Sequence, residues 1–241
     1  MKTVVVIGAS GEIGKHICTK FYKRGYNVIA GYCSNNVTNL ADKLNYKKNR
    51  LCPLFIDLQN EQSIEKFFNN AISIFGRIDV LVNCAGVSFP NLLIDTDFLQ
   101  VKKEVDVNLL GVISACKHAV KNMLNGCGGR IINIASIWGV VGGAMETTYS
   151  ATKAGLIGFS KALAKEVGSA NITVNCISPG AIKSKMNAHL NKTDYEEIKS
   201  NTPLGKIITA KEVASCAVFL ASNSAKNITG QNIVIDGGFT L

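Results

Sequence analysis

Short apolar runs that alternate with helical stretches constrain the fold of this chain more than any other feature. The runs show no regular alternation with polar residues, as expected for strands buried on both faces. They occupy residues 3–8, 27–32, 51–57, 78–86, 129–136, 172–180 and 231–238. Helical stretches lie between them at 12–24, 36–46, 61–75, 98–124 and 147–167. This alternation predicts an α/β fold with a doubly wound parallel sheet of about seven strands and helices on both faces.

The length of 241 residues suits a single domain over residues 1–241, and no linker, repeat or shift in composition divides it. One segment, residues 183–206, departs from the alternation because it is polar and rich in lysine. It follows the end of an expected strand, the edge at which open α/β sheets bind ligands. Two alternatives stay open for it: a mobile lid over a substrate, or an ordinary pair of surface helices.

Charge and cysteine content narrow the possible functions. The formal net charge of +9 fits either attraction to an acidic partner or a general preference for lysine. Nucleic-acid-binding surfaces usually gather arginine, whereas the arginines here are few and scattered, so we expect no nucleic-acid partner. Eight cysteines without a Cys-x-x-Cys pair indicate a reducing, cytoplasmic location. No histidine spacing indicates a metal, and no apolar segment is long enough for a membrane span.

The first apolar run leads into the glycine-rich turn of VVVIGASGEIG, residues 4–14. Gly8, Gly11 and Gly14 allow a sharp turn and a close approach to a pyrophosphate, and the helix that follows offers free N–H groups. Such turns also arise for steric reasons alone, but the position directly after a strand favours a dinucleotide site. Glu12 suits the positive end of the helix dipole and is expected to face solvent.

The stretch ETTYSATK, residues 146–153, places Tyr149 and Lys153 on one face of an expected helix. A nearby ammonium favours the phenolate and lowers the pKa of a tyrosine from its usual value of about 10. A phenol with a lowered pKa is useful in general acid–base catalysis. The same spacing also occurs in ordinary helices that carry out no chemistry.

The glycine turn resembles the Gly-x-x-x-Gly-x-Gly turn of the short-chain dehydrogenase/reductase family, except that Glu12 replaces the middle glycine. Further stretches match the family in order along nearly the whole chain. They are NCAG at 83–86, Asn108 in DVNLLG, Ser136 at the usual spacing before Tyr149, and SPGAI at 178–182. The resemblance implies a Rossmann-type fold and the reduction of a ketone by a nicotinamide cofactor.

The resemblance also implies roles for a catalytic set of Asn108, Ser136, Tyr149 and Lys153. Tyr149 would protonate the carbonyl oxygen while Ser136 donates a hydrogen bond to it. Lys153 would tune Tyr149 and hold the nicotinamide ribose, and Asn108 would fix a water that relays the proton. The implied cofactor-binding residues are Gly8, Ser10, Gly11, Ile13, Gly14, Tyr32, Ser34, Asn35, Asp57, Leu58, Asn83, Ala85, Gly86, Tyr149, Lys153, Pro179, Gly180 and Ile182.

Cofactor choice depends on Tyr32. In family members that prefer NADH, an acid at this position holds the ribose 2′-hydroxyl. Tyr32 would not repel a 2′-phosphate, and Ser34 and Asn35 could hydrogen-bond it, although no lysine or arginine stands in the turn or at the strand end. We therefore expect NADPH, with NADH possible.

Three functions stay open. A 3-oxoacyl group on an acyl carrier protein is one substrate, because an acidic carrier suits a basic chain. The stretch from Ser136 to Ser150 also resembles the reductase of 5-aminopentanone attached to elongation factor P. In carrier-protein reductases a small residue and a glutamine usually stand where Trp138 and Glu146 are found here. The third possibility, a dinucleotide-binding regulator without catalysis, conflicts with the intact catalytic set.

The substrate-binding residues implied by these alternatives are Ser136, Trp138, Glu146 and Tyr149. Glu146 would bind an ammonium group through a charge-assisted hydrogen bond, with a cation–π contact from Trp138. Alternatively, Glu146 only stabilises the start of its helix.

Small residues recur along the same helix, at Ala151, Ala154, Gly155, Gly158 and Ala162. They permit another helix to approach closely, either within the subunit or from a second one. The family resemblance favours a homodimer or homotetramer.

Overall fold

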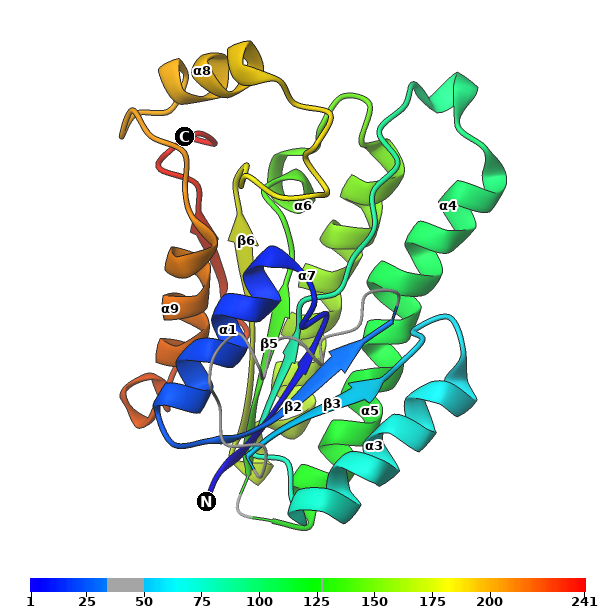
Figure 1. The fold of residues 1–241 in the computed structure, drawn as a ribbon, viewed down its shortest axis with the longest axis vertical. Coiled ribbons are helices and arrows are strands. Elements are labelled where there is room, and N and C mark those ends of the chain that lie inside the picture. Colours follow the sequence, from blue (N-terminus) through cyan, green and yellow to red (C-terminus); the bar gives the residue numbers. More distant parts are fainter. Residues whose placement is uncertain (34–49, 127) are drawn as a thin grey trace.

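The computed structural model describes residues 1–33, 50–126 and 128–241, and a parallel sheet runs through its centre (Figure 1). The strands are β1 (Thr3–Ile7), β2 (Asn27–Tyr32), β3 (Leu51–Phe55), β4 (Val80–Asn83), β5 (Gly129–Ile134), β6 (Ile172–Pro179) and β7 (Asn232–Ile235). They form one seven-stranded sheet in the order β3-β2-β1-β4-β5-β6-β7. Every neighbouring pair is parallel. The predicted doubly wound α/β fold is therefore confirmed.

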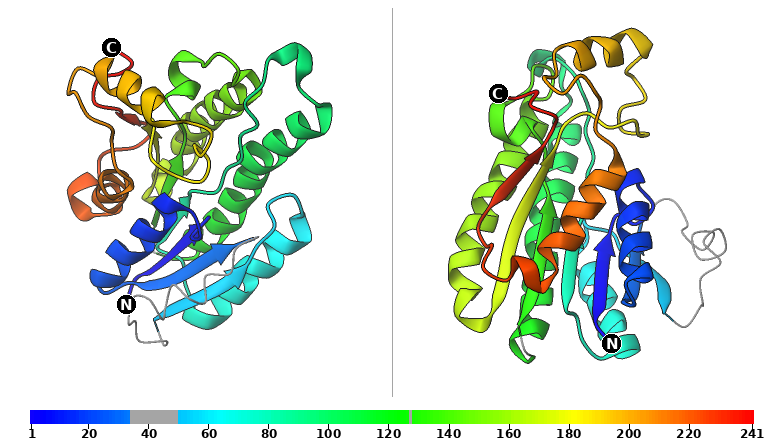
Figure 2. Two further views of the ribbon diagram at one scale, coloured as in Figure 1. Left: turned by 45° about the horizontal axis from the view of Figure 1, so that its top comes forward. Right: turned by 90° about the vertical axis from the view of Figure 1, so that its left-hand side faces the viewer.

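Helices cover both faces of this sheet (Figure 2). On one face lie α1 (Glu12–Lys23) and α9 (Ala210–Leu220), and on the other lie α3 (Glu61–Phe75), α5 (Gly111–Leu124) and α7 (Thr147–Val167). Each layer has its own apolar core. Phe21 and Val213 pack in the first, and Phe67, Met123 and Leu156 in the second. Central strands with both faces covered explain the unbroken apolar runs of the sequence.

The expected single helix over 98–124 is interrupted. It consists of α4 (Phe98–Val105), the π-helical turn η2 (Asp106–Leu110) and α5. A π turn holds an extra residue and is frequent at functional sites. Here it carries Asn108, whose side chain is fully buried. Apolar periodicity alone does not reveal such a turn.

Short elements complete the fold: η1 (Leu93–Asp95), α6 (Trp138–Val141), η3 (Gly168–Ala170), α8 (Lys192–Ser200) and η4 (Asn223–Ala225). Neither α6 nor α9 was predicted from the sequence. Residues 183–206 contain one helix, α8, rather than a helix pair, and a capping box of Asn191 and Asp194 begins it. The helix expected at 36–46 lies outside the described residues.

None of the helices in the described parts of the chain is long and apolar enough to cross a membrane. No group of three or more His, Cys, Asp or Glu side chains there is arranged to hold a metal ion.

Candidate active site

A cavity of about 480 Å³ opens at the carboxyl ends of β1 to β4. This edge lies where the order of the strands reverses, the usual ligand site of open α/β sheets. Many of the predicted cofactor-binding residues line it: Gly8, Ser10, Gly11, Ile13, Tyr32, Asp57, Leu58, Ala85, Gly86 and Ile182.

The glycine turn closes one side of this cavity, and two of its glycines are required by close approach. A Cβ on Gly8, whose φ is +90°, would lie 2.5 Å from the Ala85 nitrogen. A Cβ on Gly14 would lie 2.2 Å from the Gly8 oxygen. Helix α1 begins at Gly11 without a side-chain cap, so its first N–H groups can bind an anion in the cavity.

Glu12 also lines the cavity. Its carboxylate is exposed and lies 3.4 Å from the His16 ring nitrogen, so the side chain borders both the cavity and solvent, whereas solvent alone was expected. The turn therefore fits the pyrophosphate of a dinucleotide.

Other predicted cofactor-binding residues have structural contacts. The Asn83 side chain donates to Asn133 Oδ1 at 2.8 Å and so joins β4 to β5. The Gly180 N–H donates to the Ile235 oxygen at 2.9 Å, just beyond Pro179 at the end of β6. Ser34 and Asn35 lie outside the described residues.

Three lysines that the sequence pattern did not indicate also line the cavity: Lys15, Lys103 and Lys185. The Lys103 ammonium lies 5.8 Å from the centre of the Phe89 ring and also acts on Cys33 at the end of β2. Burial raises the pKa of the Cys33 thiol, which follows β2, Asp57 raises it further, and the Lys103 ammonium lowers it. Because Lys103 is on α4, far from β2 in sequence, no local signal could have placed it here.

The predicted catalytic residues come together beside the cavity. Tyr149 and Lys153 lie one turn apart on α7, with the Lys153 ammonium 5.5 Å from the centre of the tyrosine ring. Lys153 donates to the Ile134 oxygen at 3.0 Å. A Cβ on Gly86 would lie 3.3 Å from Asn108 Oδ1 and 3.4 Å from Lys153 Nζ, so these two side chains meet at the cleft.

Burial has the largest effect on the pKa values of Tyr149 and Lys153. It raises the pKa of Tyr149; a hydrogen bond with Ser136 lowers it, and the charges of Glu146 and Glu104 raise it further. Burial also lowers the pKa of Lys153 to about 8. The pKa of Tyr149 therefore lies above its usual value rather than below it as expected, because removal of water from the phenolate is the largest effect.

Residues 87–91, which we term the 87–91 loop, follow β4 and contact η2, α4 and the start of α7. Asn108 binds the loop twice: its side chain accepts from the Val87 N–H and donates to the Val87 oxygen, both at 2.8 Å. Further along, the Ser88 hydroxyl donates to Glu146 at 2.5 Å. No sequence pattern indicated these contacts, since the partners are distant along the chain.

Glu146 precedes α7 at the N-cap position, yet its side chain does not cap the helix. Its carboxylate binds Ser88 instead. Burial raises the pKa of Glu146, the Ser88 hydrogen bond lowers it, nearby Glu104 raises it, and His189 lowers it. A half-buried carboxylate close enough to affect Tyr149 is consistent with a substrate-facing position.

Trp138 has contacts with Phe239, Gly143 and Ser136. Its ring packs edge-on against Phe239, with 6.3 Å between the ring centres, and a Cβ on Gly143 would lie 2.8 Å from it. Its backbone N–H donates to Ser136 Oγ at 3.2 Å, so Trp138 is joined directly to a predicted catalytic residue.

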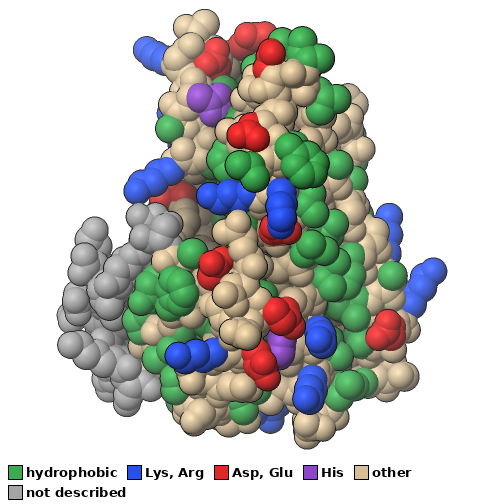
Figure 3. Space-filling model, turned by 90° about the vertical axis from the view of Figure 1, so that its right-hand side faces the viewer, with side chains coloured by type: hydrophobic (Ala, Val, Ile, Leu, Met, Phe, Trp, Pro, Cys, Tyr) green, Lys and Arg blue, Asp and Glu red, His purple; other side chains and the backbone are tan. Residues whose placement is uncertain are grey.

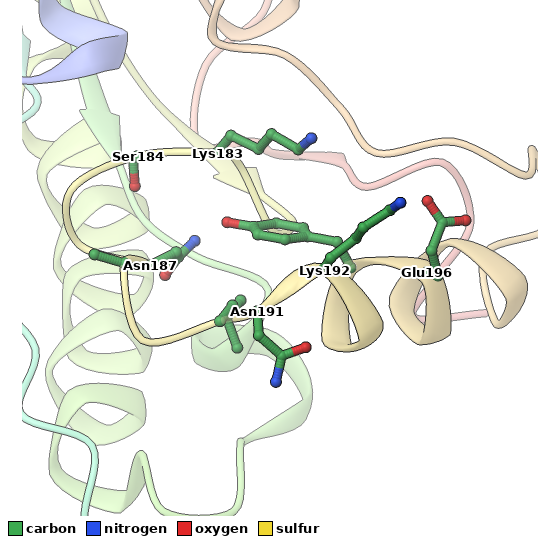
Figure 4. Close-up of a pocket in the computed structure, with 9 residues that line it drawn as sticks. Lys183, Ser184, Asn187, Asn191, Lys192 and Glu196 are labelled. Carbon is green, nitrogen blue, oxygen red and sulfur yellow. The ribbon is translucent and has the colours of Figure 1, made fainter.

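A second cavity, of about 470 Å³, lies within residues 183–196 (Figure 4). The Lys183 ammonium is 5.4 Å from the centre of the Tyr195 ring. The side chains of Lys183 and Lys192 extend toward the same side, where Glu196 also lies. Ser184 lines both cavities, so this segment adjoins the cofactor cleft directly.

The glycine turn at the cleft and the pair of Tyr149 and Lys153 beside it are features of a dinucleotide-dependent oxidoreductase. A family model described as enoyl-(acyl carrier protein) reductase matches residues 8–240. The chain is 37% identical over 239 residues to the 3-oxoacyl-[acyl-carrier-protein] reductase FabG of Chlamydia muridarum, covering 98% of this chain and 96% of that protein. It is 37% identical over 241 residues to the protein of the same name from Salmonella typhimurium, covering 100% and 98%.

A similar relative from Thermotoga maritima, also named 3-oxoacyl-[acyl-carrier-protein] reductase FabG, is 34% identical over 241 residues, covering 100% of this chain and 98% of that protein. The chain belongs to the short-chain dehydrogenase/reductase family. Membership implies oxidoreductase chemistry with a nicotinamide cofactor.

Proposed function

We propose that this protein is an NADPH-dependent ketone reductase that acts on 3-oxoacyl groups carried by an acyl carrier protein. The observation that carries the proposal is the meeting of Tyr149, Ser136 and Lys153 beside a dinucleotide cleft. Full-length similarity to reductases of that name supports the substrate class.

When bound, the nicotinamide supplies hydride to the carbonyl carbon. Tyr149 donates a proton to the carbonyl oxygen, and Ser136 stabilises the negative charge on that oxygen with a hydrogen bond. Lys153, held by the Ile134 oxygen, lies where it can bind the nicotinamide ribose. Asn108 fixes the 87–91 loop, and we retain for it the predicted role in a proton relay.

The proposed preference for NADPH over NADH follows from the charged groups near the end of β2. No carboxylate ends the strand, because Tyr32 occupies that place and packs against Phe55 with 6.2 Å between the ring centres. Lys103 and Lys15 line the same cavity and supply positive charge for a 2′-phosphate. Both observations favour NADPH over NADH.

A second substrate, a ketone with an ammonium group, is favoured by Glu146. Its half-buried carboxylate has no lysine or arginine partner among the ion pairs of the described residues. A protein-linked 5-aminopentanone, as on elongation factor P, would place its ammonium there. The acyl chain on a carrier protein is neutral and has no ammonium group to place beside Glu146.

The assay that tests the proposal follows NADPH oxidation with an acetoacetyl thioester and, in parallel, with aminopentanonylated elongation factor P. Turnover on the thioester supports the first substrate and turnover on the modified protein the second. A catalytically silent regulator would bind NADPH and oxidise it with neither.

Three further properties belong to the proposal. The carrier is an acidic protein attracted by the net charge of +9. Residues 183–206 act as a lid on a single catalytic domain of residues 1–241, because Ser184 connects their cavity to the cleft. The location is a reducing cytoplasm, in keeping with the free thiols of the described cysteines.

We also propose a homodimer or homotetramer. Hydrophobic side chains form a band over the side of the molecule that carries α4 (Figure 3). The most exposed of them are Leu93, Ile94, Phe98 and Leu99. On α7, the small residues Ala151, Ala154, Gly158 and Ala162 are exposed as well. Such apolar surface is typical of an interface between subunits.

A further inference from the structure

Residues 236–241, which we term the 236–241 turn, follow β7 and have no part in the reaction outlined above. Asp236 closes this turn. Its carboxylate accepts from the Gly238 N–H at 2.8 Å, from the Thr240 N–H at 2.9 Å and from the Thr240 hydroxyl at 2.7 Å. Gly237 and Gly238 have φ angles of +73° and +92°, in the region that favours glycine. A turn fixed in this way presents the side chains that it carries in defined positions.

The 236–241 turn is also held against the end of the segment of residues 183–206. The Leu204 N–H donates to the Gly237 oxygen at 3.1 Å. A Cβ on Gly238 would lie 3.0 Å from the Pro203 ring. Figure 1 shows the C-terminus at the same end of the molecule as α6 and α8. The turn is therefore anchored to the protein beside the short helix that follows the catalytic serine.

Phe239, which this turn carries, packs against Trp138. The planes of the two rings meet at 74°, the edge-to-face arrangement that aromatic pairs favour. Gly143 contacts the same indole, since a Cβ there would lie 2.8 Å from the Trp138 ring. Two segments that are distant in sequence therefore fix one indole ring.

The place of α6 depends on this ring. The helix has four residues and no side-chain cap, and a helix so short is not stable by itself. Its valines, Val140 and Val141, are exposed and its remaining residue is a glycine. Among the side chains of α6, Trp138 therefore provides the packing.

The backbone of Trp138 in turn holds the hydroxyl of Ser136. Its N–H donates to Ser136 Oγ at 3.2 Å, and Ser136 is buried. A hydroxyl oxygen that accepts from this N–H keeps its own proton for another acceptor. Ser136 is thereby left able to donate to the carbonyl oxygen of a ketone.

We propose that Phe239 is a positioning residue for the reduction: it fixes the Trp138 ring, and Trp138 then keeps Ser136 Oγ oriented to donate to the carbonyl oxygen. The proposal rests on the reductase function proposed above. Phe239 acts on the reaction only through Trp138 and Ser136, so its substitution should lower kcat and leave the KM for NADPH unchanged.

Three variants test the role of the ring. Phe239→Ala removes it, and Phe239→Tyr keeps an aromatic edge as the conservative rescue. Phe219→Ala is the matched control, because Phe219 is an exposed phenylalanine on α9. We expect kcat of Phe239→Ala to fall roughly tenfold, less than the loss of about 10² or more that follows removal of an oxyanion donor. Phe239→Tyr and Phe219→Ala should match wild type.

A double-mutant cycle shows whether the effect passes through Ser136. Phe239→Ala is repeated in Ser136→Ala protein, and the slow reduction is followed with enzyme in excess of ketone. It should cause no further loss there, because the hydroxyl that it positions is absent. The same fold loss in both backgrounds would overturn the proposal, as would wild-type kcat in Phe239→Ala or a kcat of Phe239→Tyr as low as that of Phe239→Ala.

A measurement without substrate separates this proposal from the proposed function. Trp138 is the single tryptophan of the chain, so protein fluorescence excited at the red edge reports on its ring. Quenching by acrylamide should be stronger in Phe239→Ala than in wild type and unchanged in Phe239→Tyr and Phe219→Ala. Equal quenching in all four proteins would overturn this proposal alone. Wild-type protein that reduces no ketone would overturn the proposed function, and this proposal with it.

Discussion

The two ends of the cleft differ in what holds them in place. The end proposed for the cofactor is shaped by the backbone of the glycine turn, and the end proposed for the substrate is held by side chains of the 87–91 loop and its partners. At the cofactor end, β1 and α1 meet in a turn whose geometry is set by the backbone, with no room for a Cβ on Gly8 or Gly14. At the substrate end, the 87–91 loop is fastened by side chains from α4, η2 and the start of α7. A backbone site needs particular residues at fixed local spacing, whereas a side-chain site needs partners that only the fold brings together.

We expect substitutions at the two ends of the cleft to have different consequences. The largest effect on turnover is expected at Tyr149, the residue that both ends share. Tyr149→Phe removes the proton donor and keeps the packing of the ring, so turnover should fall by about 10² or more. NADPH affinity, measured by fluorescence titration, should stay within a few-fold of wild type. Near-normal turnover would remove Tyr149 from the role of acid.

The next largest effect is expected from a substitution in the glycine turn. In Gly14→Ala the new Cβ would lie 2.2 Å from the Gly8 oxygen, so the turn must shift. We expect a loss of about 1–3 kcal/mol in the free energy of unfolding, measured by urea denaturation, together with weakened NADPH binding. Gly168→Ala is the control, because Gly168 has helical φ and ψ angles and nothing within 4 Å of its Cβ position. Equal free energies of unfolding for the two variants would contradict the claim that the turn has no room for a Cβ at residue 14.

A smaller effect is expected at the substrate end. Glu146→Gln removes the charge and keeps an acceptor for Ser88. If the substrate carries an ammonium group, kcat/KM for the amino ketone should fall roughly tenfold, about 1.4 kcal/mol. Activity on a neutral β-ketoester should hold or rise. Equal losses on both substrates, or none on either, would leave Glu146 with only the structural role of holding Ser88.

The smallest effect concerns selectivity between cofactors. Tyr32→Asp places a carboxylate at the end of β2, where it repels a 2′-phosphate, so the ratio of kcat/KM for NADPH over NADH should fall several-fold. Lys103→Met should weaken NADPH binding more than NADH binding. Wild-type protein that already uses NADH with the higher kcat/KM would show that the charge argument is wrong.

The glycine turn at the cavity was predicted well from the sequence, because its determinants are local. The apolar runs located all seven strands, and the glycine spacing located the turn that lines the cavity. The helical spacing of Tyr149 and Lys153 correctly placed them on one face, although their burial reversed the expected change in the tyrosine pKa.

The substrate end was predicted less completely, for a physical reason. Glu104 and Lys103 are adjacent on α4, and both act on the 87–91 loop: Glu104 accepts from the Phe89 N–H, and the Lys103 ammonium lies 5.8 Å from the centre of the Phe89 ring beside the cofactor cavity. Phe89 is not near them in sequence, and the π turn that carries Asn108 leaves no mark on the apolar pattern. Glu146 was identified, but its partner Ser88 was not, since a hydroxyl in a loop has no periodicity to indicate its contacts.

The central claim is that Tyr149 donates a proton during NADPH-dependent reduction of a ketone. Its most direct test is a single-turnover experiment in which NADPH absorbance is followed after wild-type protein and Tyr149→Phe are mixed with an acetoacetyl thioester carried on an acyl carrier protein. The account predicts rapid loss of absorbance with wild type and a rate lower by about 10² or more with the variant. Bound NADPH that stays reduced in the wild-type protein, with this thioester and with an amino ketone alike, would contradict it.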